Sequence, residues 1–124
     1  MRIRRKKWAK EELDASKIYI HDGSIYRNKW KNQFPNDNPI HIELGCGKGS
    51  FIAKLASLNK DINYIAIDMI EAMIGIANRN ILEEYNSLDL DLKNIFLVRQ
   101  NVDFTFGSLA SSLLNCFSNH ATFK

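Results

Sequence analysis

The segment at residues 40–49 constrains the fold of this chain more than any other part of the sequence. It begins with a short apolar run at residues 40–44, which suits a buried strand, and then places glycines on alternate positions. Apolar residues follow at helical spacing over 51–58. Gly45 and Gly47 allow a sharp turn through positive φ and leave room for a ligand. Gly49 is expected to let the new helix pack close to the strand. A strand, a glycine turn and a helix in this order open a nucleotide-binding α/β unit.

The spacing of the glycines is G-x-G-x-G, with Glu43 two residues before the first of them. Dinucleotide-binding enzymes instead carry G-x-G-x-x-G, and their helix N-terminus faces a pyrophosphate. An acidic residue beside the turn would repel that anion. Glu43 suits a ligand with a positive end, such as the ammonium and sulfonium groups of S-adenosylmethionine. A glycine-rich turn alone is also compatible with an ordinary structural loop.

Two further predicted strands end in polar residues. The strand at residues 63–68 ends in Asp68, about 20 residues after the turn, where such folds place an acid that binds the ribose hydroxyls. The alternative for Asp68 is an N-cap of the helix predicted over 70–81. The strand at residues 95–98 leads to Asn101 and Asp103, at the end of the strand where ligands bind in open α/β sheets. The alternative there is an ordinary polar turn.

Basic residues are concentrated at the start of the chain. The formal net charge is only +3, but the first ten residues contain no acid and six basic side chains, namely Arg2, Arg4, Arg5, Lys6, Lys7 and Lys10. Such an arm often binds nucleic acid, and we predict RNA contact for the first five of these residues. The alternative is an arm whose charges stay in solvent. Trp30 and Phe34 are expected to pack on the core.

Several classes of protein and site are disfavoured by the sequence. No apolar run is long enough to span a membrane, and no signal peptide is recognisable, so no membrane partner is expected. Cys46 and Cys116 form no disulfide framework, which favours a reduced, cytoplasmic protein. His21, His41 and His120 lack metal-binding partners at ligand spacing, so no metal site is expected.

The chain resembles the bacterial tRNA (guanine-N7-)-methyltransferase family over about residues 1–103. The resemblance rests on Arg-x-Arg with Lys-Trp-Ala at 2–9, on Ile-Glu-x-Gly-x-Gly-Lys-Gly-x-Phe at 42–51, and on Asn-Tyr-Ile-x-Ile-acid at 63–68. It implies a Rossmann-like methyltransferase fold, S-adenosylmethionine as cofactor, and methylation of guanine N7 in the tRNA variable loop. It also implies that the cofactor-binding acids are Glu43, Asp68 and Asp103. Asp68 stands where the family more usually has glutamate.

The resemblance stops after Asp103. The family continues into a strand that ends in Asn-Phe-x-Asp-Pro-Trp-Pro-Lys, and this motif is absent here. We therefore predict an arm at 1–38, a partial methyltransferase domain at 39–103 and a divergent tail at 104–124, as in a truncated or frame-shifted product. The catalytic residue is unknown, since the family's aspartate lies in the missing motif. Weak or no methylation by this chain alone is expected.

The predicted fold class is α/β, an incomplete Rossmann-like fold with about three parallel strands and flanking helices. Without a fourth strand beside the first, the ligand crevice would have one wall, and a bare apolar strand edge would permit self-association. The alternative to the enzyme is a non-catalytic RNA-binding or cofactor-binding module completed by another chain. A nicotinamide oxidoreductase is disfavoured by Glu43 and by the glycine spacing.

Overall fold

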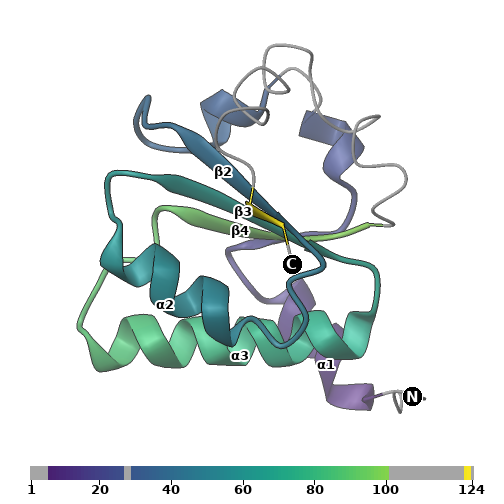
Figure 1. Ribbon diagram of the computed structural model, residues 1–124. Helices are drawn as coiled ribbons and strands as arrows, with labels where there is room; N and C mark the ends of the chain where they lie inside the picture. The colour runs from purple at the N-terminus through teal and green to yellow at the C-terminus, as the bar shows by residue number, and fades with distance from the viewer. Residues whose placement is uncertain (1–5, 27–28, 101–121, 124) are drawn as a thin grey trace.

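The computed structural model describes residues 6–26, 29–100 and 122–123, which form one sheet of five parallel strands (Figure 1). Their order across the sheet is β1-β4-β3-β2-β5. The bounds are Tyr19–Ile20 for β1, Ile40–Leu44 for β2, Asn63–Asp68 for β3, Ile95–Arg99 for β4 and Thr122–Phe123 for β5. The three longer strands are those predicted from the apolar runs. The two short strands β1 and β5 extend the sheet on either side of these three.

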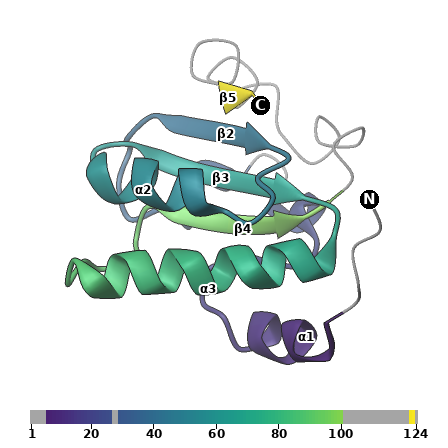
Figure 2. The same ribbon diagram turned by 60° about the horizontal axis from the view of Figure 1, so that its bottom comes forward.

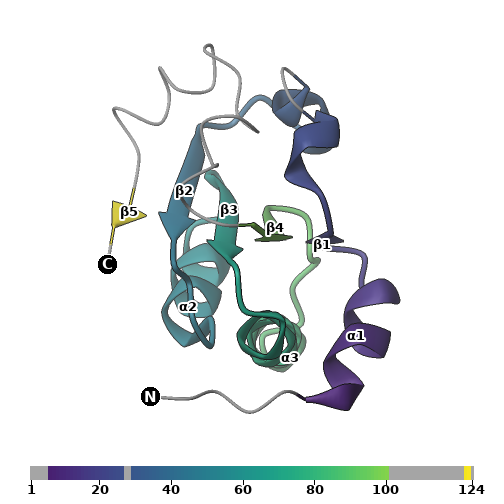
Figure 3. The same ribbon diagram turned by 90° about the vertical axis from the view of Figure 1, so that its right-hand side faces the viewer.

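Helices cover one face of the sheet, and short 3-10 segments cover the other (Figure 3). The helices are α1 (Lys7–Asp14), α2 (Ser50–Leu58) and α3 (Glu71–Ser87), and the 3-10 segments are η1 (Gly23–Tyr26) and η2 (Trp30–Gln33). The central strand β3 is buried from Asn63 to Ile67, which explains its nearly unbroken apolar run. The predicted α/β architecture is confirmed.

The second face of the sheet is closed by aromatic side chains from the N-terminal part of the chain. Trp30 and Phe34 are 2% and 6% exposed, and both pack in the cluster that contains Ile42 and Ile65. Each ring meets Phe96 edge to face, with centroid distances of 6.4 Å for Trp30 and 5.0 Å for Phe34. The expectation that these two aromatic residues pack on the core is confirmed.

Helix α1 lies in a stretch where the sequence suggested little regular structure. Its buried face is narrow, because only Ala9 and Leu13 are buried, and two apolar positions give a weak periodic signal. The helix packs on α3 at Gly75, where an added Cβ would lie 2.7 Å from the Cβ of Ala9. Arg79 of α3 stacks 3.4 Å from the ring centroid of Trp8 and forms an ion pair with Glu12. Tertiary contacts with α3 therefore stabilise α1.

A buried amide joins α2, α3 and β4 at the amino ends of the strands. The Nδ2 group of Asn94 donates to the carbonyl oxygens of Ala56 and Ile62 at 3.0 Å each, and its Oδ1 accepts a hydrogen bond from the hydroxyl of Tyr85. Burial raises the pKa of Tyr85. We expect Tyr85→Phe to lower the free energy of unfolding by about 1–2 kcal/mol in urea, because a buried acceptor loses its donor. Tyr26→Phe, on a half-buried ring, is the control, and equal losses in both variants would contradict the prediction.

Candidate functional site

The turn between β2 and α2 is left-handed at three glycines. The φ angles of Gly45, Gly47 and Gly49 are 72°, 57° and 74°. A Cβ added to Gly45 or Gly47 would meet nothing within 4 Å, so the space beside these two residues is open. At Gly49 an added Cβ would lie 2.7 Å from the Cβ and 2.9 Å from the Cα of Ala77. Gly49 therefore allows α2 to pack closely against α3. The sequence analysis instead expected Gly49 to bring this helix close to the preceding strand.

Four backbone N–H groups of this turn donate hydrogen bonds inside the protein. Gly45 and Cys46 donate to the carbonyl oxygen of Ile67 at 2.8 and 3.0 Å, Gly47 donates to Oδ2 of Asp68 at 2.9 Å, and Gly49 donates to the carbonyl oxygen of Cys46 at 3.1 Å. A phosphate-binding turn instead aims such N–H groups at its ligand. These four N–H groups of the turn are thus turned toward the protein and not toward a ligand.

Asp68 links the glycine turn to the start of α3. Its Oδ2 accepts the bond from the N–H of Gly47, and its Oδ1 accepts a bond of 3.1 Å from the N–H of Ile70. The N-cap position of α3 is Ile70, so Asp68 is not the N-cap considered from the sequence. The carboxylate is only partly buried, and each of its oxygens has a second lone pair. Asp68 can therefore hold the turn and still accept a hydrogen bond from a ligand.

Glu43 lies on the strand next to Asp68, on the same face of the sheet. It is in register with Ala66 of β3, two residues before Asp68, and alternation along a strand places both acids on the face that the helices cover. Glu43 is fully buried. The structure therefore brings the two predicted acids to one edge of the sheet, with Glu43 inside the protein and Asp68 at the surface of the turn.

The short strand β5 occupies the place of the fourth strand in this topology (Figure 2). It runs parallel to β2 and pairs Thr122 with Glu43 and Phe123 with Leu44. The sheet order makes β2 the switch point, where ligands bind in open α/β sheets. The prediction of a bare edge and a one-walled crevice is therefore wrong beside Glu43 and Leu44. Self-association through the rest of this edge stays a prediction.

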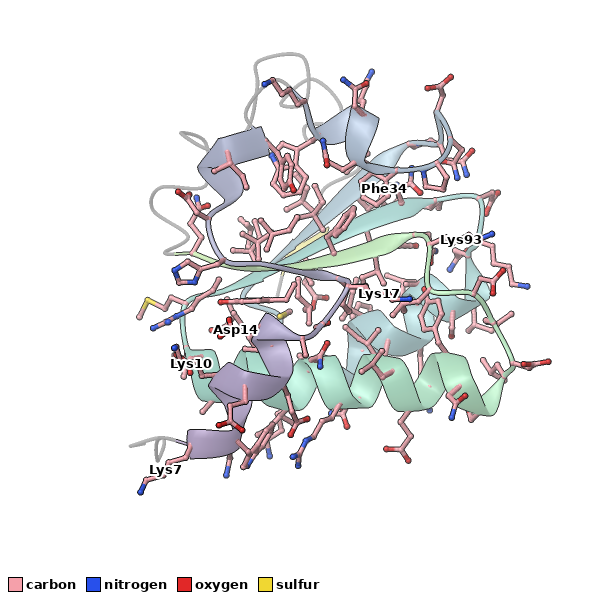
Figure 4. The ribbon with its side chains drawn as sticks, turned by 180° about the vertical axis from the view of Figure 1, so that it is seen from behind. Lys7, Lys10, Asp14, Lys17, Phe34 and Lys93 are labelled. Carbon is pink, nitrogen blue, oxygen red and sulfur yellow. The ribbon has the colours of Figure 1, made fainter. Side chains whose placement is uncertain are left out.

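The other predicted site residues fall in two groups. Arg2, Arg4, Arg5 and Asp103 lie outside the described residues. Lys6 precedes α1 and is partly buried, whereas Lys7 is the exposed first residue of that helix. Figure 4 shows Lys7 projecting from the end of α1, with Lys10 on the same helix.

The sequence analysis missed two residues that contact the loops of the site. Asn80 of α3 donates from Nδ2 to the carbonyl oxygen of Lys48 at 2.8 Å. Arg99, at the end of β4, forms an ion pair of 3.0 Å with Glu71 and donates to the carbonyl oxygen of Met69 at 3.4 Å. Arg99 could have been predicted from the sequence, because it is a basic residue at the carboxyl end of a predicted strand. No local pattern points to Asn80, because its partner lies 32 residues away.

A cavity of about 220 Å³ lies beside Arg99, between α1 and the start of α3. Its polar lining includes Lys10, Tyr19, His21 and Glu71. Burial raises the pKa of Tyr19, while the nearby Arg99 acts in the opposite direction. Basic and acidic groups are mixed in this lining, so the cavity has no clear preference for ligands of one charge.

The described residues lack two features that would point to other functions. No group of three or more His, Cys, Asp or Glu side chains in those ranges could hold a metal ion. Within the same ranges, no helix has the length and apolar character needed to cross a membrane.

Residues 37–121 match the model of a family described as "Putative methyltransferase". The chain belongs to this methyltransferase family. The match extends past Asp103, where the sequence analysis placed the end of the family resemblance. The resemblance itself is confirmed.

Curated relatives in the methyltransferase family carry the name tRNA (guanine-N(7)-)-methyltransferase. The protein from Ruminiclostridium cellulolyticum is 46% identical over 104 residues, which cover 83% of this chain and 44% of the relative. The proteins from Clostridium botulinum (strain Eklund 17B) and Clostridium beijerinckii are each 45% identical over 102 residues, which cover 82% of this chain and 47% of the relative. The chain thus spans about half the length of the curated relatives it matches.

Among solved structures, the chain is similar to one described as an antibiotic related methyltransferase. The sequence identity is 24% and the TM-score is 0.45, with 61% of this chain and 37% of the other chain covered.

Proposed function

We propose that this chain carries the cofactor-binding part of a tRNA (guanine-N7-)-methyltransferase, with S-adenosylmethionine as methyl donor and tRNA as substrate. The observation that carries the proposal is the glycine turn, which is open beside Gly45 and Gly47 and in which Asp68 accepts a hydrogen bond from the N–H of Gly47. Such a turn offers carboxylate and carbonyl acceptors. It therefore fits a ligand with a positive end and ribose hydroxyls better than a ligand with phosphates.

Each acid would contribute differently to cofactor binding. Asp68 would accept hydrogen bonds from the ribose hydroxyls, and the backbone of Gly45 and Gly47 would let the ligand approach closely. Glu43 is buried next to the turn, where a carboxyl group would suit the positive end of the ligand. Asp103 follows β4 in the sequence and keeps its proposed role as a cofactor-binding acid, although it lies outside the described residues.

Methyl transfer to guanine N7 would require little acid–base catalysis from the residues of this chain. When bound, S-adenosylmethionine supplies an electrophilic methyl group. Guanine N7 has a lone pair at neutral pH, so the acceptor needs no general base. The work of the protein is to align the reacting groups and to exclude water from them. Residues that hold ligands in place, such as Asp68, are therefore expected to matter more than proton-transfer groups.

A titration with S-adenosylhomocysteine tests the proposed cofactor. We expect the purified 124-residue chain to bind it saturably in isothermal titration calorimetry and to show no binding of NAD⁺ at the same concentrations. Preference for NAD⁺, or the absence of any heat with S-adenosylhomocysteine, would overturn the proposal.

We propose that the basic N-terminal residues contact tRNA phosphates, at the end of the molecule that carries α1 (Figure 4). The double variant Lys6→Ala/Lys7→Ala is expected to weaken tRNA binding roughly three- to tenfold and to reduce the slope of log K against log salt by about 1–2, since each lost phosphate contact removes about one unit. S-adenosylhomocysteine affinity should not change. Filter binding at several salt concentrations measures the tRNA affinity and its salt dependence. A tRNA substrate would place the protein in the cytoplasm.

The control for this arm is Lys60→Ala/Lys93→Ala, which removes two exposed charges at the amino ends of the strands. Equal losses in both double variants would show that binding follows net charge alone. If the chain bound tRNA through the arm but bound no S-adenosylhomocysteine, the non-catalytic RNA-binding module would be the better description.

A further inference from the structure

The side chain of Asn80 on α3 forms a hydrogen bond with the glycine turn. Its Nδ2 group donates to the carbonyl oxygen of Lys48 at 2.8 Å, across 32 residues of sequence. The same peptide unit, between Lys48 and Gly49, uses its N–H to donate to the carbonyl oxygen of Cys46 at 3.1 Å. Both polar atoms of this peptide are therefore held, one from within the turn and one from the neighbouring helix.

The turn needs such external contacts because its own sequence specifies its conformation weakly. Lys48 lies between two glycines, which adopt many backbone conformations at similar free energy. Asp68 holds the N–H of Gly47, on one side of Lys48, whereas Asn80 holds the carbonyl group on the other side. Without the amide of Asn80, the Lys48–Gly49 peptide would keep one hydrogen bond and could rotate more freely.

We propose that Asn80 is a positioning residue that keeps the glycine turn in its ligand-binding conformation and so raises cofactor affinity without touching the cofactor. This inference rests on the proposed function of the turn. A turn that is already ordered loses less conformational entropy when a ligand binds. Since the hydrogen bond is exposed to solvent, it contributes more to the population of one turn conformation than to the stability of the fold.

The test compares two substitutions at Asn80 in the full 124-residue chain. Asn80→Ala removes the amide, and Asn80→Asp keeps its size but replaces the donor with a carboxylate that cannot donate when ionised. Both variants are expected to bind S-adenosylhomocysteine roughly five- to tenfold more weakly than the unmodified chain in calorimetry, as the loss of one hydrogen bond predicts. Amide hydrogen exchange at Gly49 should accelerate. The melting temperatures of both Asn80 variants should equal that of the control variant. The control is Asn86→Ala, at an exposed position later in α3.

The possible outcomes separate this inference from the proposed function. Unchanged affinity in both Asn80 variants, while the unmodified chain binds, would overturn the role of Asn80 and leave the proposed function standing. A melting temperature that falls together with the affinity would assign Asn80 a structural role only and would also overturn the inference. If the unmodified chain failed to bind S-adenosylhomocysteine, the proposed function would fall first, and the inference with it.

Discussion

Replacing Gly49 with alanine is expected to destabilise the chain by about 2–5 kcal/mol, a large fraction of the roughly 5–15 kcal/mol that stabilises an ordinary domain. Two costs add at this position. The φ angle of 74° costs a residue with a Cβ about 1–2 kcal/mol. The new Cβ would also lie 2.9 Å from the Cα of Ala77, so α2 and α3 would have to separate, at a cost of about 1–3 kcal/mol. Urea denaturation followed by circular dichroism measures the sum.

Gly45→Ala is the matched control for this prediction. Its φ angle of 72° carries the same backbone cost, but an added Cβ there meets nothing within 4 Å. We therefore expect it to lose only about 1–2 kcal/mol. The difference between the two variants isolates the helix–helix contact at Ala77, and equal losses would show that this contact is not limiting.

Asp68→Ala is expected to weaken binding of S-adenosylhomocysteine by about 100-fold, because hydrogen bonds to a charged group contribute about 1.5–3 kcal/mol each. The variant loses the proposed acceptor for the ribose hydroxyls. It also removes the acceptor of two hydrogen bonds, which the N–H groups of Gly47 and Ile70 donate to Asp68 at 2.9 and 3.1 Å. The turn should then sample other conformations, which lowers affinity further. Isothermal titration calorimetry on the folded variant gives the loss directly.

Asp61→Ala removes an exposed carboxylate from the loop before β3 and should leave the affinity unchanged. Asp68→Asn keeps an oxygen acceptor but loses the charge, so an intermediate loss of roughly tenfold is expected. If Asp68→Ala bound as tightly as the unmodified chain, Asp68 would be a residue of turn structure and not of the cofactor site.

The sequence predicted the parts of the fold that depend on local patterns. Short, largely apolar runs predicted β2, β3 and β4, and the alternate glycines predicted the left-handed turn at the end of β2. The short strands β1 and β5 could not be predicted, because two residues carry no periodicity and their partners are distant in sequence. Helix α1 was not predicted because its buried face packs against Gly75 of α3, and no pattern within α1 indicates this contact.

The same distinction applies to the candidate site. Glu43 is the next-to-last residue of β2 and Asp68 is the last residue of β3, so their positions at one edge of a parallel sheet followed from topology. Whether a side chain at that edge is buried depends on its neighbours in three dimensions, and the burial of Glu43 had no local signal. The contact between Asn80 and Lys48 had none either, since neither residue stands out by type or spacing.

The parallel pairing of every strand in the described sheet has a consequence for folding kinetics. Neighbouring strands never follow each other through a tight hairpin, since β2 pairs Ile40 with Asn63, and β1 pairs Tyr19 with Leu97. Each pairing must therefore wait for the closure of a long loop, which costs chain entropy before any ladder forms. We expect slow refolding, with helical signal from α2 and α3 appearing before the sheet is complete.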